Sequence, residues 1–267
     1  MAIDYVIDLD CVPKQTLSTG GILERLKGRA RAGEVIRLFR ENGDDRPPSE
    51  MGFEFTRTSA EGEEETRVIV VQDMLDEAAA LDPLAHYCAG CPANVSGVPF
   101  GCMNFIQYPI TAEAERWLLD RLPGIDEPLV WLLLRQGVQE LGYDGAVVAP
   151  LRANEVYFEE QRLAGRDMRE FVINANQVFQ MLFLTGHIQP AHAGVLLLLF
   201  GAIRRDVEAH QIVHVMNRAL PSEQIARDFP FLMRPEDGDD RTVADLKRFF
   251  YALHRAWMLD VQLLLDV

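Results

Sequence analysis

The chain has 267 residues, of which 48% are hydrophobic and 25% are charged, and its formal net charge at pH 7 is -15. Length and composition are typical of a globular protein with one large domain or two smaller ones. Acidic residues outnumber basic ones in both halves of the chain, which argues against nucleic acid and anionic membrane surfaces as main partners, since both attract Lys and Arg.

Neither end of the chain nor its interior predicts a membrane segment. The first ten residues include acidic side chains and lack a basic start followed by an apolar stretch, so they do not predict a secretory signal. The longest apolar run, Ala193–Ile203, is about half the roughly 20 residues that a membrane-spanning helix needs. We therefore expect a cytoplasmic protein.

The N-terminal part predicts a strand and then a helix. Ile3–Leu9 alternates apolar and acidic residues, as a half-buried strand does, and it ends just before Cys11. Ser18 or Thr19 can cap a helix that ends near Arg31, because Gly33 follows it. Residues 35–39 are either a strand or a continuation of this helix.

A hairpin and a short helix complete the predicted small sheet. Residues 53–58 and 67–71 are strand-like and flank the turn sequence Gly62–Glu65. Asp73 can cap a helix that stops before Pro83. We therefore predict an α+β fold in which residues 1–110 form a small sheet with helices and a Cys-rich metal-binding loop.

Residues 111–267 predict a mainly α-helical half, either a second domain or part of one unit with the first. Thr111 and Asp126 can cap two helices, and Asp167 with Glu170 matches a capping box for a third that ends at Gly186. Pro190 begins a long predicted helix that ends near Arg218. Thr242 and Asp245 open a last helix, whose apolar end packs in the core or docks a second copy of the chain.

The four cysteines carry the strongest motif in the sequence. Cys88 and Cys91 form a C-x2-C pair beside Gly90, and Cys102 follows after ten residues. Two thiolates at this spacing can bind one metal ion, and glycine permits the tight turn. Cys11 completes a set of four thiolate ligands, and His86 is the reserve fourth ligand.

Zinc is the metal that this set predicts first, in a structural site of four ligands. An iron-sulfur cluster is the alternative, because Cys91 precedes a proline, although the spacing matches neither common ferredoxin pattern. The competing interpretation is that the cysteines are small buried side chains without a metal. Disulfides are disfavoured because the cytosol keeps thiols reduced.

A second metal site is also conceivable on the predicted helix 190–218. Asp206, His210 and His214 are each separated by one helical turn and would share one face. The competing interpretation places both histidines in a helical core, because they continue an apolar stripe. That stripe comprises Leu196, Leu199, Ile203 and Val207.

These patterns lead to three hypotheses for the function. The first is a metal-binding protein, stabilised by structural zinc, whose helical half binds a protein partner or a small molecule. The second is an iron-sulfur redox protein that uses the same cysteines, and the third is a metallo-enzyme centred on the histidine pair. The sequence does not decide whether the protein is an enzyme.

Overall fold

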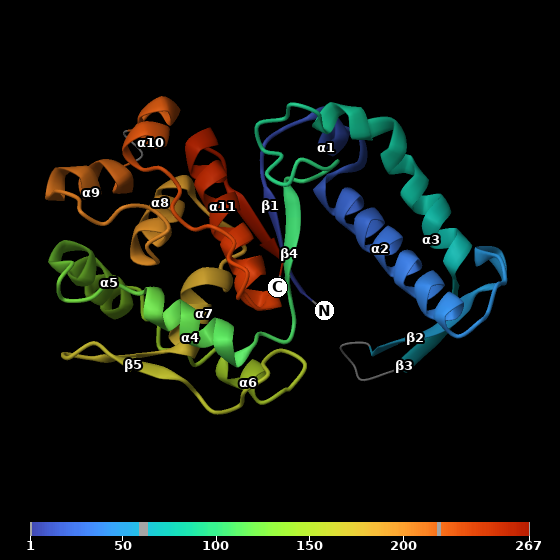
Figure 1. The fold of residues 1–267 in the computed structure, drawn as a ribbon, viewed down its shortest axis with the longest axis horizontal. Helices are drawn as coiled ribbons and strands as arrows, with labels where there is room; N and C mark the ends of the chain where they lie inside the picture. The colour runs from blue at the N-terminus through green and yellow to red at the C-terminus, as the bar shows by residue number, and fades with distance from the viewer. Residues whose placement is uncertain (1, 59–63, 218–219, 267) are drawn as a thin grey trace. The chain divides into compact units, whose positions relative to one another are not determined.

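The computed structural model describes residues 2–58, 64–217 and 220–266, apart from the side chains of 55–58, 64–65 and 266. It combines helices and strands (Figure 1), which confirms the predicted mixture of the two. No helix in this described part is long and apolar enough to cross a membrane.

The chain forms two compact units. The larger unit comprises Met1–Leu9, Pro92–Gly97 and Gly101–Val267, and the smaller unit comprises Asp10–Cys91 and Val98–Phe100. These limits differ from the predicted boundary between residues 110 and 111, because the first strand belongs with the C-terminal part of the chain.

An antiparallel sheet forms the centre of the larger unit. Its strand order is β4 (Met103–Gln107), β1 (Ala2–Ile7), β8 (Leu263–Asp266) and β7 (His187–Ile188). The predicted first strand is therefore confirmed. It is buried from Ile3 to Ile7, however, and not half-buried, so side chains on both of its faces are covered; along its edges it pairs with β4 and β8.

The C-terminal apolar segment corrects one prediction. It does not continue the last helix, because α11 (Arg241–Leu259) ends at Asp260, whose backbone is left-handed with φ of 54°. Leu263 and Leu265 then pair with Ile7 and Tyr5 as part of β8. A run of leucines suits a buried strand as well as a helix, so the sequence pattern alone did not separate the two.

Helix α11 packs its aromatic side chains against the sheet. Asp240 caps its N-terminus by accepting a hydrogen bond from the Val243 N–H, at 2.7 Å, so the helix starts close to the predicted place. The Phe249 ring lies 5.3 Å from that of Tyr5 on β1 and 5.1 Å from that of Phe183. This aromatic cluster is part of the core of the larger unit.

Further helices surround this core. Thr111 caps the first of them through the Ala114 N–H, as predicted. They are α4 (Ala112–Arg121), α5 (Pro128–Glu140), α6 (Ala149–Arg152), α7 (Ala175–Phe183), α8 (Pro190–Leu199), α9 (Ala209–Met216) and α10 (Ser222–Asp228).

The predicted capping box of Asp167 and Glu170 is wrong. Residues 165–174 form a hairpin of β5 (Gly165–Asp167) and β6 (Val172–Asn174). The capping box lies at Asn174 and Gln177, each of which accepts a backbone hydrogen bond from the other, and it opens α7. Asp167 with Glu170 and Asn174 with Gln177 both have the spacing of a capping box. The first pair cannot cap a helix because it lies in the hairpin.

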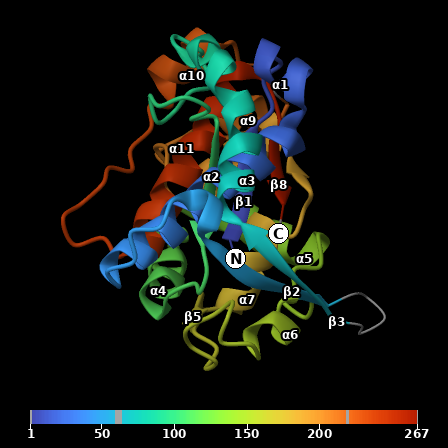
Figure 2. The same ribbon diagram turned by 90° about the vertical axis from the view of Figure 1, so that its right-hand side faces the viewer.

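The smaller unit is a helical layer with a hairpin, and Figure 2 shows α3 beside α2. Ser18 caps α2 as predicted, but Gly33 does not end this helix, which continues to Glu41. The predicted hairpin is confirmed in its two strands, and residues 62 and 63 of its turn lie outside the described part. The elements are α1 (Val12–Leu17), α2 (Thr19–Glu41), η1 (Pro48–Glu50), β2 (Gly52–Thr58), β3 (Glu64–Val70), α3 (Val71–Ala78) and η2 (Ala79–Cys88).

Candidate functional site

The cysteines of the predicted metal site are divided between the two units. Cys11, Cys88 and Cys91 belong to the smaller unit and Cys102 to the larger one, and all four are free thiols. Within the described ranges, no three His, Cys, Asp or Glu side chains form a group that could hold a metal ion. The metal site therefore stays a prediction.

The C-x2-C segment nevertheless has a defined local geometry. Cys88 is buried at the end of η2, and the Cys91 N–H donates to its carbonyl across a turn in which Gly90 has φ of +72°. The N–H of Phe100 donates to the Cys88 Sγ at 3.1 Å. Backbone donors to sulfur stabilise thiolates in metal sites, so this arrangement is compatible with metal binding.

The reserve ligand and the first cysteine occupy different settings. His86 is exposed and its ring lies 4.0 Å from that of Tyr87. Cys11 is half-buried directly before α1, where its side chain caps no backbone N–H. Cys102 directly precedes β4, and its carbonyl accepts the Ile7 N–H at 3.0 Å.

The second predicted metal site is not formed. The predicted helix 190–218 is two helices, because α8 ends at Leu199 and Gly201 has φ of +65°, and the predicted end near Arg218 lies outside the described residues. Asp206 lies between the helices and pairs with Arg204 at 2.9 Å.

The two histidines of that site lie on α9, with ring centroids 5.7 Å apart. Both His210 and His214 are exposed, so their predicted burial in a helical core is also wrong. His210 Nδ1 lies 3.2 Å from a carboxylate oxygen of Glu208. The apolar stripe of the sequence ends with α8, and the histidines belong to the solvent face of the next helix.

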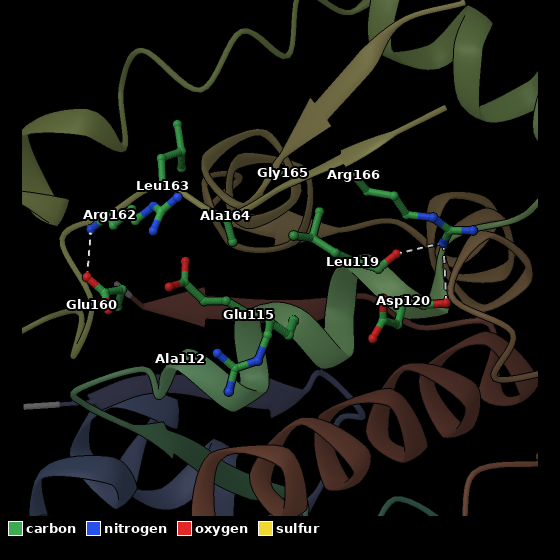
Figure 3. Close-up of a pocket in the computed structure, with 11 residues that line it drawn as sticks. Ala112, Glu115, Leu119, Asp120, Glu160, Arg162, Leu163, Ala164, Gly165 and Arg166 are labelled. Atoms are coloured by element: carbon green, nitrogen blue, oxygen red, sulfur yellow. Dashed lines mark hydrogen bonds between the residues drawn. The ribbon is translucent and has the colours of Figure 1, made fainter. Parts of the chain in front are cut away.

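The larger unit contains a cavity of about 530 Å³ between α4 and the segment 160–166 (Figure 3), which we call the α4 pocket. Its walls combine small apolar side chains with charged ones. The lining residues are Ala112, Glu115, Arg116, Leu119, Asp120, Glu160, Arg162, Leu163, Ala164, Gly165 and Arg166.

One lining residue of the α4 pocket, Glu115, belongs to a buried ion pair. Arg152, the last residue of α6, binds both carboxylate oxygens of Glu115, with an Nη1 to Oε2 distance of 3.0 Å. The same Nη1 also donates to the Glu160 carbonyl at 2.8 Å, Nε donates to the Asn176 Oδ1 at 2.6 Å, and the guanidinium lies over the Phe158 ring. Burial raises the pKa of Glu115, and the pair with Arg152 opposes that rise.

The C-terminal end of α4 is held by a second arginine of the pocket. Arg166, on β5, donates from Nη1 to the carbonyls of Leu119 and Leu122, at 2.8 and 2.7 Å. A cation at a helix C-terminus satisfies carbonyls that have no partner within the helix. Arg166 therefore ties the hairpin to α4 and fixes the distance between the two walls.

No family model matches the chain, and no curated protein or solved structure matches it either. The function is therefore inferred from the chain's own residues.

A second cavity, of about 470 Å³, lies at the other side of the end of α4. Its arginines already have partners. Arg205 binds Glu127 at 2.9 Å and the Leu198 carbonyl, Arg204 binds Asp206, and the Arg121 guanidinium lies over the Trp117 ring. This cavity offers a ligand fewer unoccupied donors than the α4 pocket does.

The α4 pocket could not be predicted from the sequence. One signal was present: Glu115 shares a helix face with Leu118 and Leu119, and a carboxylate on an apolar face needs a buried partner. The partner, Arg152, comes from another helix, so its identity could be known only from the fold.

Proposed function

We propose that the protein is a non-enzymatic binding protein whose larger unit holds a small ligand in the α4 pocket. The observation that carries the proposal is a cavity of about 530 Å³, one of whose lining residues, Glu115, is fixed by a buried, bidentate ion pair with Arg152. Cavities of roughly 300–1,000 Å³ are typical of small-molecule sites. The ion pair and the Arg166 contacts hold the walls in place before a ligand arrives, which lowers the cost of binding.

The lining suits a ligand that has an apolar part and a polar part. Leu119, Leu163 and Ala164 supply apolar surface, while Arg116 and Arg162 supply hydrogen-bond donors. Figure 3 shows Glu115 extending from α4 toward the segment that carries Arg162 and Ala164. A ligand bound there would contact both walls.

A space-filling substitution tests this function. Ala164→Phe would occupy the α4 pocket, whereas Val172→Phe adds the same ring to the exposed β6 strand of the same hairpin. We expect a thermal-shift screen of anionic, neutral and cationic metabolites to find a class that stabilises the wild type and Val172→Phe but not Ala164→Phe. If no class does so, or if Ala164→Phe responds equally, the pocket is not a ligand site.

We also propose a structural metal in the cysteine set, as a second candidate function. Its specific support is the hydrogen bond from the Phe100 N–H to the Cys88 Sγ, within the turn to Cys91. Under this proposal residues 86–102 are the metal-binding loop, zinc is the first metal to test, and an iron-sulfur cluster is the alternative. Such a site requires reduced thiols, as in the cytoplasm.

Metal analysis of the purified chain decides this second candidate. One equivalent of zinc in a colourless protein supports the structural site, and a brown protein absorbing near about 400 nm supports a cluster. Cys91→Ser is expected to lose the metal and unfold at lower temperature, while Ala89→Ser in the same turn keeps it. A metal-free wild type purified without chelator would contradict both forms of the proposal.

A further inference from the structure

Two arginines of the α4 pocket have guanidinium groups that are not held by another side chain in the part of the chain that the structure describes. Neither Arg116 nor Arg162 uses its guanidinium in a hydrogen bond or ion pair there, although both line the pocket. Other arginines near the pocket are occupied, because Arg152 binds Glu115 and Arg166 binds the end of α4. The two unpaired guanidinium groups are therefore available to a ligand.

The acidic residues of the pocket form no ion pair with these guanidinium groups. Both oxygens of the Glu115 carboxylate accept hydrogen bonds from Arg152. The Glu160 carboxylate accepts the backbone N–H of Arg162 at 3.0 Å. Asp120 lies toward the Arg166 end of the pocket, away from Arg162 (Figure 3).

From these charges we infer that the α4 pocket binds a small oxyanion, a carboxylate or a phosphate, through Arg162 and Arg116. The inference rests on the proposed ligand-binding function and specifies its ligand class. A guanidinium group offers a planar set of donors that matches carboxylate and phosphate oxygens. The apolar wall of Leu119 and Leu163 then contacts the carbon part of the ligand.

Titration of the full chain with three probes tests the inference. Succinate and inorganic phosphate represent the two oxyanions, and succinamide has the shape of succinate without its charge. We expect saturable calorimetric binding of succinate or phosphate, weaker binding at higher salt, and no binding of succinamide. The oxyanion that binds with the higher affinity shows whether the site prefers carboxylate or phosphate.

Arginine substitutions locate the binding. Arg162→Gln and Arg116→Gln are each expected to weaken oxyanion binding about ten-fold or more, since each removes a charge-assisted hydrogen bond. Arg234→Gln, at an exposed arginine of the larger unit outside the pocket, is the matched control and should bind as the wild type does.

Each other outcome overturns the inference. Equal affinity for succinamide and succinate, or unchanged affinity in both pocket variants, would show that no arginine-bound oxyanion occupies the site. Absence of binding by both oxyanions would have the same meaning. The broader proposed function would survive these results if neutral or cationic metabolites still stabilised the wild type and not Ala164→Phe.

Discussion

Arg152 and Glu115 form a bidentate ion pair in which the side chains are only 6% and 4% exposed. Removing one member leaves the other charged and buried without its partner. We expect Glu115→Gln and Arg152→Met each to lower the free energy of unfolding by about 3–5 kcal/mol in urea denaturation. The double variant Glu115→Leu/Arg152→Met should recover most of that loss, because no buried charge remains.

The exposed pair of Arg135 and Glu170 is the control for this prediction, with side chains 38% and 56% exposed. Glu170→Gln should change the free energy of unfolding by about 1 kcal/mol or less. A loss at Glu115 no larger than the loss at Glu170 would contradict the importance of the buried pair.

Substitution by alanine at two glycines is expected to change the stability of the chain in opposite directions. Gly201 has φ of +65°, and an added Cβ would lie 3.2 Å from the Arg205 guanidinium, so Gly201→Ala should destabilise the chain by about 1–2 kcal/mol. Gly33 lies exposed inside α2 with open space at its Cβ position, so Gly33→Ala should stabilise by about 0.5–1 kcal/mol. Equilibrium unfolding measures both, and shifts of the same sign would contradict the two backbone assignments.

The capping residues of α7 can be distinguished by mutation. Asn174 accepts the Gln177 N–H at 3.0 Å, so Asn174→Ala should cost about 1 kcal/mol of unfolding free energy. Glu170→Ala, in the capping box that the sequence suggested, should cost less, since Glu170 lies in the β5–β6 turn. A larger loss at Glu170 would favour a helix that begins near residue 167.

Buried histidine predicts a dependence of stability on pH. The His254 Nε2–H donates to the Phe229 carbonyl at 2.9 Å, and burial lowers the pKa of His254 below the usual value of 6.5. Protonation therefore favours the unfolded chain, so the stability contribution is complete above about pH 6.5 and is lost as the pH falls below it. Burial also lowers the pKa of His192, so its contribution to stability changes with pH in the same direction.

Urea unfolding between about pH 8 and pH 5 measures this dependence. His254→Gln keeps a side-chain donor and should flatten the curve, whereas His187→Gln, at an exposed position, should leave it unchanged. An unaltered curve in His254→Gln would show that His254 does not cause the dependence.

Local signals predicted several elements correctly, including the first strand, the cap at Thr111 and the start of α8 at Pro190. They failed where the fold decides between equal local patterns. Gly33 was predicted to end a helix and instead lies inside α2. Gly201 lay within the predicted helix 190–218 and instead follows the end of α8 with a positive φ.

The site depended even more on distant contacts. The α4 pocket needs α4, α6 and the β5 strand together, and no short segment contains more than one of them. The cysteine motif was visible because it is local, but Cys11, the fourth ligand that the sequence suggests, lies far from it in the chain. Sequence spacing could therefore suggest a metal without establishing which residues approach it.

The pairing of β1 with β8 joins two strands that lie far apart in the sequence. During synthesis, the edge of β1 that pairs with β8 has no partner until residues 263–266 have left the exit tunnel. Throughout that interval the edge is an exposed template with which other chains can pair and aggregate.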